Sequence, residues 1–153
     1  MADSLKETSF EAIQTLKKMG ITPVMLTGDH QNTANFIAEK LGIQEVYAQV
    51  KPEEKAQIVK KFQAQGITTM VGDGINDAPA LASADIGVAM STGTDVAIES
   101  ADITLLHGDL KKLVLALRIS KLTQSAILQN LAWAFGFNLI GIPLAAGVFY
   151  PVF

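Results

Sequence analysis

The first hundred residues alternate between two patterns of apolar positions. Phe10, Ile13 and Leu16 have the spacing of one face of a helix, and this pattern recurs twice before residue 66. The three predicted helices end at glycines, namely Gly20, Gly42 and Gly66. Short uninterrupted apolar runs predict strands at 22–26, 46–48, 67–71, 86–90 and 103–106. Strands that alternate with helices of this length indicate βαβ units, so we expect an α/β fold with a parallel sheet.

The end of the chain has a different pattern, because residues 130–150 are uncharged and mostly apolar. As a helix these 21 residues would be about 31 Å long, close to the ~30 Å hydrocarbon core of a bilayer. We therefore predict a transmembrane helix there, and a buried core helix is the alternative. The predicted organisation is a globular domain at 1–109, a basic connecting helix at 110–129 and the transmembrane helix at 130–150.

Charge is unevenly distributed along the chain. Residues 1–109 hold 8 Lys and Arg against 15 Asp and Glu, whereas residues 110–121 hold four basic residues and no acidic one. Basic residues directly before a span favour the cytoplasmic side, so we expect residues 1–121 there and the span in the plasma or inner membrane, with the lipid bilayer as partner. With 18% charged residues and no Cys, the composition excludes a disordered chain, a basic nucleic-acid-binding module and a disulfide scaffold.

Two groups of polar residues lie at positions suited to a phosphate. Ligands of parallel sheets bind at the carboxyl ends of strands, and Thr27-Gly28-Asp29 directly follows the first predicted strand. A Thr hydroxyl and the free N–H groups of a glycine turn suit a phosphate oxygen. Further along, the segment KPEEK at 51–55 has a proline that fits the first turn of a helix, and a lysine presented there suits a phosphoryl group.

A third group combines two carboxylates in a glycine turn. Asp73 and Asp77 lie four residues apart in GDGIND, which follows the predicted strand at 67–71. Two carboxylates this close repel each other unless a cation lies between them, and their oxygens suit Mg²⁺. Asn76 can donate a hydrogen bond to a phosphoryl oxygen. The sequence therefore predicts a site for Mg²⁺ and phosphate at one edge of the sheet.

The three groups occur in an order that resembles a known family. TGD, KPEEK, GDGINDAPAL, ADIGVAM and GTDVAIESADITLL are similar to the phosphorylation domain of P-type ATPases. The heavy-metal-transporting subgroup is most similar, above all its copper(I) exporters. The resemblance extends over nearly the whole chain, and it implies a Rossmann-type parallel sheet of the haloacid-dehalogenase kind followed by a membrane helix.

The resemblance also implies a role for each residue of the site. Thr27, Gly28 and Asp29 would hold the phosphoryl group, and Lys55 would neutralise its charge. The implied Mg²⁺ site consists of Asp73 and Asp77, with Asn76 beside them. The implied cofactors are Mg²⁺ and ATP, the latter bound by a nucleotide-binding domain that this sequence does not contain.

The uncharged segment extends the resemblance into the membrane. Copper exporters carry a Tyr-Asn pair in the membrane helix after this domain, as part of the transport site, and this chain has Phe137-Asn138 there. Zinc- and cadmium-transporting relatives typically carry a Lys in that helix, whereas this chain has none. The resemblance implies that Asn138 binds the transported ion, Cu⁺ or Ag⁺. A hydrogen bond between membrane helices is its alternative role.

One part of the family pattern is absent from the sequence. The phosphorylated aspartate of these ATPases lies in a DKTGT motif, on a strand between the TGD strand and the GDGIND strand, and no such string occurs here. We therefore expect a sheet without its nucleophile strand and no turnover by this chain alone. The implied function is that of part of an ATPase that exports a soft metal ion, together with the remainder of the transporter or a complementary fragment. The alternatives are a membrane-anchored phosphatase of the same fold and a non-catalytic fragment that binds phosphate and Mg²⁺.

Overall fold

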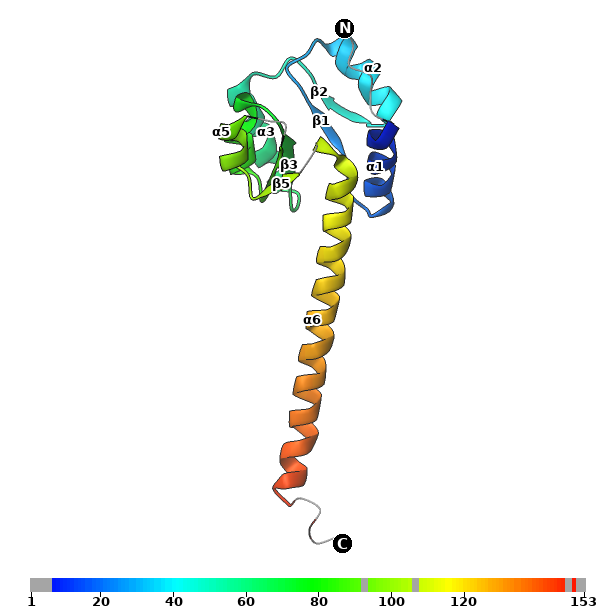
Figure 1. Cartoon of the computed structure of the whole chain (residues 1–153), viewed down its shortest axis with the longest axis vertical. Coiled ribbons are helices and arrows are strands. Elements are labelled where there is room, and N and C mark those ends of the chain that lie inside the picture. Colours follow the sequence, from blue (N-terminus) through cyan, green and yellow to red (C-terminus); the bar gives the residue numbers. More distant parts are fainter. Residues whose placement is uncertain (1–6, 92–93, 106–107, 148–149, 151–153) are drawn as a thin grey trace. The chain divides into compact units, whose positions relative to one another are not determined.

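The computed structural model describes residues 7–91, 94–105, 108–147 and 150. The chain forms two compact units, Met1–Val114 and Leu115–Phe153. Helices and strands alternate along the first unit, and the second consists mainly of one long helix (Figure 1). The elements are α1 (Glu7–Lys18), β1 (Val24–Leu26), α2 (Gln31–Leu41), β2 (Glu45–Tyr47), α3 (Pro52–Gln63), β3 (Thr69–Gly72), the 3-10 turn η1 (Ile75–Asp77), α4 (Ala78–Ser83), β4 (Ile86–Met90), α5 (Asp95–Glu99), β5 (Ile103–Leu105) and α6 (Leu110–Ala145).

The predicted fold class is confirmed. Each of the five predicted strands is present, and within the described residues its ends lie at most two residues from the predicted ones. Leu106, the last residue of the fifth predicted strand, lies outside the described residues. All three strand pairings are parallel, as expected for a chain in which each strand is followed by a helix.

Two of the three predicted helix ends are confirmed. Gly20 and Gly42 follow α1 and α2 with φ angles of 79° and 71°, the left-handed conformation that glycine adopts without strain. The third prediction was wrong, because α3 already ends at Gln63, before Gly66. The chain there makes a further turn in which the Gly66 N–H binds the Phe62 carbonyl at 3.1 Å, and Gly66 has no positive φ.

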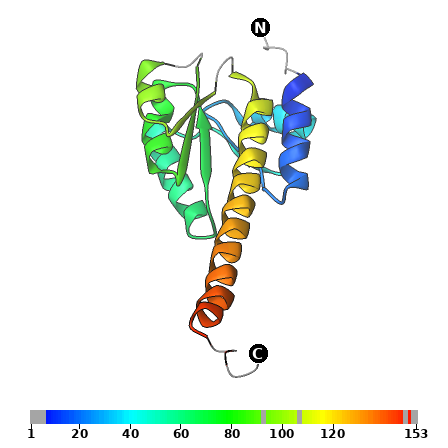
Figure 2. The ribbon, with the colours of Figure 1, turned by 60° about the horizontal axis from the view of Figure 1, so that its bottom comes forward.

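The strands form two separate sheets rather than one. β1 pairs with β2, and β4 lies between β3 and β5 in a second sheet (Figure 2). Neither β1 nor β3 has a strand partner on its second side among the described residues. The gap between them agrees with the prediction that a strand is missing between the TGD and GDGIND strands.

The core lies against the three-stranded sheet. Buried side chains from α3, β3, α4 and α5 form one cluster, with Leu26 of β1 packed against it. Its members are Val59, Met70, Ala80, Leu81 and Ala97. A Cβ atom at Gly87 in β4 would lie 2.7 Å from the Leu81 carbonyl oxygen, so only glycine allows α4 to pack this closely on the sheet. The two sheets are thus joined by apolar packing and not by hydrogen bonds between β1 and β3.

The predicted connecting and transmembrane segments form one continuous helix, α6. Asp109 caps its start, because the Asp109 carboxylate accepts a hydrogen bond from the Lys111 N–H at 2.9 Å. The helix ends at Ala145, five residues before the end of the predicted segment. It is 36 residues long, with a mean hydropathy of 1.3 in an 18-residue window of which nothing is buried. This helix is therefore long and apolar enough to cross a membrane.

Candidate functional site

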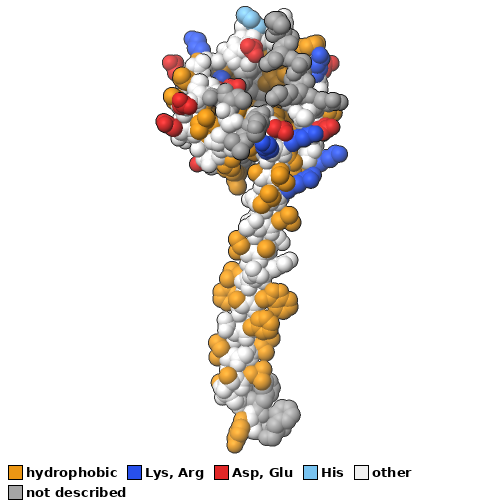
Figure 3. Space-filling model, in the orientation of Figure 1, with side chains coloured by type: hydrophobic (Ala, Val, Ile, Leu, Met, Phe, Trp, Pro, Cys, Tyr) orange, Lys and Arg blue, Asp and Glu red, His pale blue; other side chains and the backbone are white. Residues whose placement is uncertain are grey.

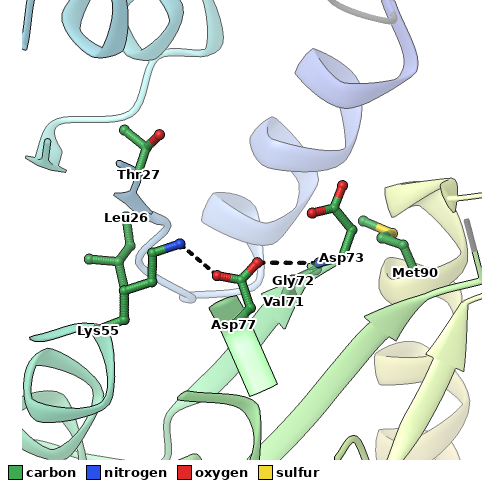
Figure 4. A pocket seen from close by; sticks show the side chains of 8 residues that line it. All are labelled: Leu26, Thr27, Lys55, Val71, Gly72, Asp73, Asp77 and Met90. Atoms are coloured by element: carbon green, nitrogen blue, oxygen red, sulfur yellow. Dashed lines mark hydrogen bonds and ion pairs between the residues drawn. The ribbon is translucent and has the colours of Figure 1, made fainter. Parts of the chain in front are cut away.

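Half of the predicted site residues lie around one cavity of about 320 Å³ at the carboxyl ends of β1 and β3. We call it the central cavity, and its lining residues are Leu26, Thr27, Lys55, Val71, Gly72, Asp73, Asp77 and Met90 (Figure 4). The cavity opens where the two sheets fail to meet. Four of the residues predicted for phosphate and Mg²⁺ therefore lie together, although up to 50 positions separate them in the sequence.

An ion pair crosses the cavity. Lys55 Nζ lies 2.6 Å from Asp77 Oδ1, and the two side chains are 12% and 13% exposed. The other Asp77 oxygen faces the Asp73 N–H at 3.4 Å. Both oxygens of Asp77 thus have partners within the protein, so this residue acts here as the counter-ion of Lys55 rather than as an open metal ligand.

Local structure places both members of this pair. Helix α3 begins at Pro52, and the Glu54 carboxylate accepts a hydrogen bond from the Lys51 N–H at 3.0 Å, which fixes the first turn. Lys55 lies one residue beyond Glu54 and so projects from this ordered turn. Asp77 ends η1 and directly precedes α4, in which Ala78, Ala80 and Leu81 are buried.

Gly72, the last residue of β3, makes room for Asp77. A Cβ atom at Gly72 would lie 2.7 Å from the Asp77 Cβ and 2.9 Å from one of its carboxylate oxygens. No side chain fits at that distance, so glycine is required for the turn to bring Asp77 against the strand end. A Cβ atom at Gly74, two residues later, would make only an ordinary contact, 3.8 Å from an Asp77 carboxylate oxygen.

Asp73 is the open carboxylate of the cavity. Its backbone carbonyl accepts a hydrogen bond from the Thr94 N–H at 3.0 Å, but its side chain has no hydrogen bond or ion pair with a described residue. In the described part of the chain, no three His, Cys, Asp or Glu residues cluster closely enough to hold a metal. Mg²⁺ needs no such cluster, because it keeps several waters and binds through one or two carboxylates. Asp73 therefore fits Mg²⁺ as a ligand of an otherwise hydrated ion.

Thr27 begins a turn that is held from two sides. The Thr27 N–H donates to the Tyr47 carbonyl at 2.9 Å, and the Thr27 carbonyl accepts from the Val50 N–H at 3.1 Å. The Thr27 hydroxyl lies 3.0 Å from an Asp29 carboxylate oxygen and accepts from the Asp29 N–H at 3.2 Å. The backbone is thus fixed, while the hydroxyl is engaged within its own turn.

Gly28 leaves open space beside this turn. A Cβ atom there would touch only the Val50 carbonyl oxygen, at an ordinary 3.6 Å. The fold alone does not require glycine at this position, and the exposed backbone is accessible to a ligand. An open, fixed glycine turn next to a lysine is the arrangement that a phosphoryl group needs.

Four predicted site residues lie outside the set that lines the central cavity. Gly28 and Asp29 are exposed in the turn after Thr27, and Asn76 is exposed on η1. Asn138, the residue predicted for the transported ion, is exposed on α6 in the other compact unit. The ring of the preceding residue, Phe137, stacks on Trp133 with centroids 5.9 Å apart.

Met90, which also lines the cavity, ends the ADIGVAM segment, but nothing in that motif marks it as a site residue. The only signal is its position, because it ends β4 and the last residues of adjacent parallel strands meet at one edge of the sheet. The spatial role of Gly72 is equally hidden, since the motif GDG alone does not show which glycine is sterically required.

Known proteins resemble this chain over most of its length. Residues 1–85 match the haloacid dehalogenase-like hydrolases. The chain is 55% identical over all of its length to a probable copper-transporting ATPase, PacS, of Synechocystis sp., of which it covers 21%. It is 51% identical over all of its length to a silver exporting P-type ATPase of Salmonella typhimurium, of which it covers 19%. The chain thus spans about a fifth of the length of these relatives.

A solved structure also resembles this chain. The crystal structure of a zinc-transporting PIB-type ATPase in the E2.Pi state matches with a TM-score of 0.89 and 41% identity, over 95% of this chain and 24% of that one. The resemblance inferred from the TGD, KPEEK and GDGIND motifs is therefore confirmed. The chain belongs to the haloacid dehalogenase-like hydrolase family, and over nearly its whole length it is similar to heavy-metal P-type ATPases.

Proposed function

We propose that this chain is part of a P-type ATPase that couples ATP hydrolysis to the export of a monovalent soft metal ion, Cu⁺ or Ag⁺. The observation that carries the proposal is the central cavity, where Thr27, Lys55 and Asp73 converge at the open edges of two sheets. A copper-transporting and a silver-exporting relative support the choice of ion. The absence of Lys from 122–153 agrees with it, because zinc- and cadmium-type relatives typically carry one.

In this proposal the phosphoryl group occupies the central cavity. Lys55 turns from Asp77 toward the phosphoryl oxygens and neutralises their charge. The N–H groups of the Gly28 turn and the Thr27 hydroxyl, released from Asp29, complete the binding of these oxygens, and Asn76 closes the site. Asp73 holds Mg²⁺, which when bound supplies positive charge to the phosphoryl group. ATP binds to a nucleotide domain outside this sequence.

The proposed organisation follows the sequence prediction. Residues 1–109 form the phosphorylation part on the cytoplasmic side, residues 110–129 connect it to the membrane, and residues 130–150 lie in the plasma or inner membrane. The bilayer and the rest of the transporter are its partners, and Asn138 binds the transported ion. A membrane-anchored phosphatase is not favoured. Both relatives named above match this chain over its full length, and both are named as transporters.

A chimera tests the proposal. This chain replaces the matching segment of the Synechocystis relative, and metal-stimulated phosphorylation from ATP is measured in membrane vesicles. Cu⁺ and Ag⁺ should stimulate formation of a phosphoenzyme, whereas Zn²⁺ should not, and Asp73→Asn in the chimera should abolish the response. A chimera that inserts in the membrane yet shows no stimulation by either monovalent ion would refute the proposal.

A further inference from the structure

Two cations on α6 have no partner within the described part of the protein. Arg118 and Lys121 are exposed, and neither forms a hydrogen bond or an ion pair with a described residue. The earlier basic residues of the helix differ from them, since Lys111 pairs with Glu11 at 2.5 Å. Arg118 and Lys121 are also the last charged residues of the chain.

These two cations lie on one face of the helix. Positions three, four and seven apart are neighbours on a helix surface, and Arg118, Lys121 and Ser125 have this spacing. Two cations and a hydroxyl thus point to the same side. Such a set of hydrogen-bond donors matches the oxygens of one phosphate group.

The end of α6 sets the depth of this face. The predicted span covers 130–150, but α6 ends at Ala145. A helical span of about 20 residues that ends there begins near Ala126, four residues before the predicted start. Lys121 then lies roughly 8 Å and Arg118 roughly 12 Å outside the hydrocarbon core. The headgroup layer is about 5–8 Å thick, and the long side chains of Lys and Arg reach into it from such positions. The space-filling view shows no charged side chain on the lower part of α6 (Figure 3).

We propose that Arg118, Lys121 and Ser125 bind the phosphate of an anionic phospholipid in the cytoplasmic leaflet. The proposal rests on the insertion of α6, which is part of the proposed function. A lipid is favoured over a soluble anion because the face lies at the step into an uncharged segment, where lipid phosphates are concentrated. Residues 1–109 carry a net excess of seven acidic side chains, so the attraction for anions is local to this face of α6.

Trp133 provides the probe, because it is the sole tryptophan of the chain and lies about 10 Å inside the proposed start of the span. The full chain is reconstituted in vesicles of phosphatidylcholine and phosphatidylglycerol, with bromine on the acyl chains of one lipid at a time. Quenching of Trp133 then gives the relative association constant of the two lipids. We expect a several-fold preference for phosphatidylglycerol, since each basic residue near the surface contributes about fivefold at most.

Matched variants decide whether Arg118, Lys121 and Ser125 cause the preference for phosphatidylglycerol. Arg118→Gln/Lys121→Gln should bring the ratio close to one, and Ser125→Ala should lower it less. Lys60→Gln/Lys61→Gln removes the same charge from exposed positions on α3 and should leave the ratio unchanged. Inorganic phosphate at constant ionic strength should not alter it.

Three outcomes would overturn the proposal. Equal quenching by both lipids, or a preference that survives the double Gln variant, would show that these residues do not select an anionic lipid. Loss of the preference in inorganic phosphate would show that the face binds free phosphate instead. Absence of quenching by either lipid would show that α6 is not inserted, and the membrane part of the proposed function would then fail as well.

Discussion

The ion pair between Lys55 and Asp77 gives the sharpest test of how the central cavity is built. Lys55→Met removes the cation but keeps the length of the side chain. Asp77 would then remain as a carboxylate in a residue that is only 9% exposed, facing no positive group. We expect the variant to fold with a clear loss of stability, because an unpaired charge at such a position loses hydration without compensation.

The size of the loss follows from the geometry. At 2.6 Å and an effective dielectric constant of about 20, the attraction between the two charges is about 6 kcal/mol before desolvation is subtracted. Breaking one side of a buried pair costs about 3–5 kcal/mol. Since the side chains keep 12% and 13% exposure, water reaches the remaining charge, and we expect about 3 kcal/mol. For a unit of this size the melting temperature should fall by about 12 °C.

Thermal unfolding in detergent micelles, followed by circular dichroism, measures this loss. Lys60→Met on the exposed side of α3 is the matched control and should change the melting temperature by no more than about 2 °C. Adding Asp77→Asn to Lys55→Met removes the stranded charge and should restore roughly 1–2 kcal/mol. If Lys55→Met melts together with Lys60→Met, or if the second substitution restores nothing, the pair does not stabilise the cavity.

Four further predictions follow from other features. A peptide with a DKTGT strand and its apolar lead-in should raise the melting temperature by filling the gap between β1 and β3, with a gain of about 2.7 kcal/mol at 100 times its dissociation constant, and a scrambled peptide should not. The chain alone should form no acyl-phosphate from radiolabelled ATP, and a hydroxylamine-labile phosphoprotein would contradict this. Gly72→Ala should destabilise the first unit by roughly 1–3 kcal/mol through its clash with Asp77, while Gly74→Ala, measured in the same urea titration, should cost clearly less. The hydrogen bond that Tyr47 donates to Glu45 raises the pKa of the phenol above its ordinary value of about 10, so the folded state holds this proton more tightly than the unfolded chain. Stability should therefore be intact below about pH 10 and fall as the pH rises through the folded pKa, and Tyr47→Phe should remove that dependence in urea unfolding.

The strands and the position of the site could be predicted because both depend on local patterns. Apolar runs between glycine turns defined the strands. Thr27 and Asp73 each follow the carboxyl end of a parallel strand, and both line the central cavity although the two strands belong to different sheets. The partner of Asp77 could not be predicted, because a carboxylate in a glycine turn suits Mg²⁺ and a lysine equally well. Its choice depends on where α3 places Lys55, 22 positions away in the sequence.

Two further features could not be predicted from the sequence, namely a core contact beside the cavity and the end of α6. The gap in the sheet was expected from the absent motif. Leu26, which lines the cavity, also packs against the core cluster, and no periodicity in the sequence encodes this contact. The end of α6 at Ala145 was missed because 130–150 has uniform hydropathy. Pro143 lies inside the last turn without ending the helix there, so the proline alone did not mark the boundary.

The ionic groups of the central cavity have a thermodynamic consequence for its ligands. Lys55, Asp73 and Asp77 together carry a net charge of −1, so a phosphate dianion that enters alone meets an unfavourable potential. A divalent cation at Asp73 reverses that sign. The two ligands should therefore bind with positive cooperativity, and because linkage is reciprocal, phosphate must raise the affinity for the cation by the same factor. In the proposed function, the cavity therefore binds phosphate tightly only after its divalent cation has bound.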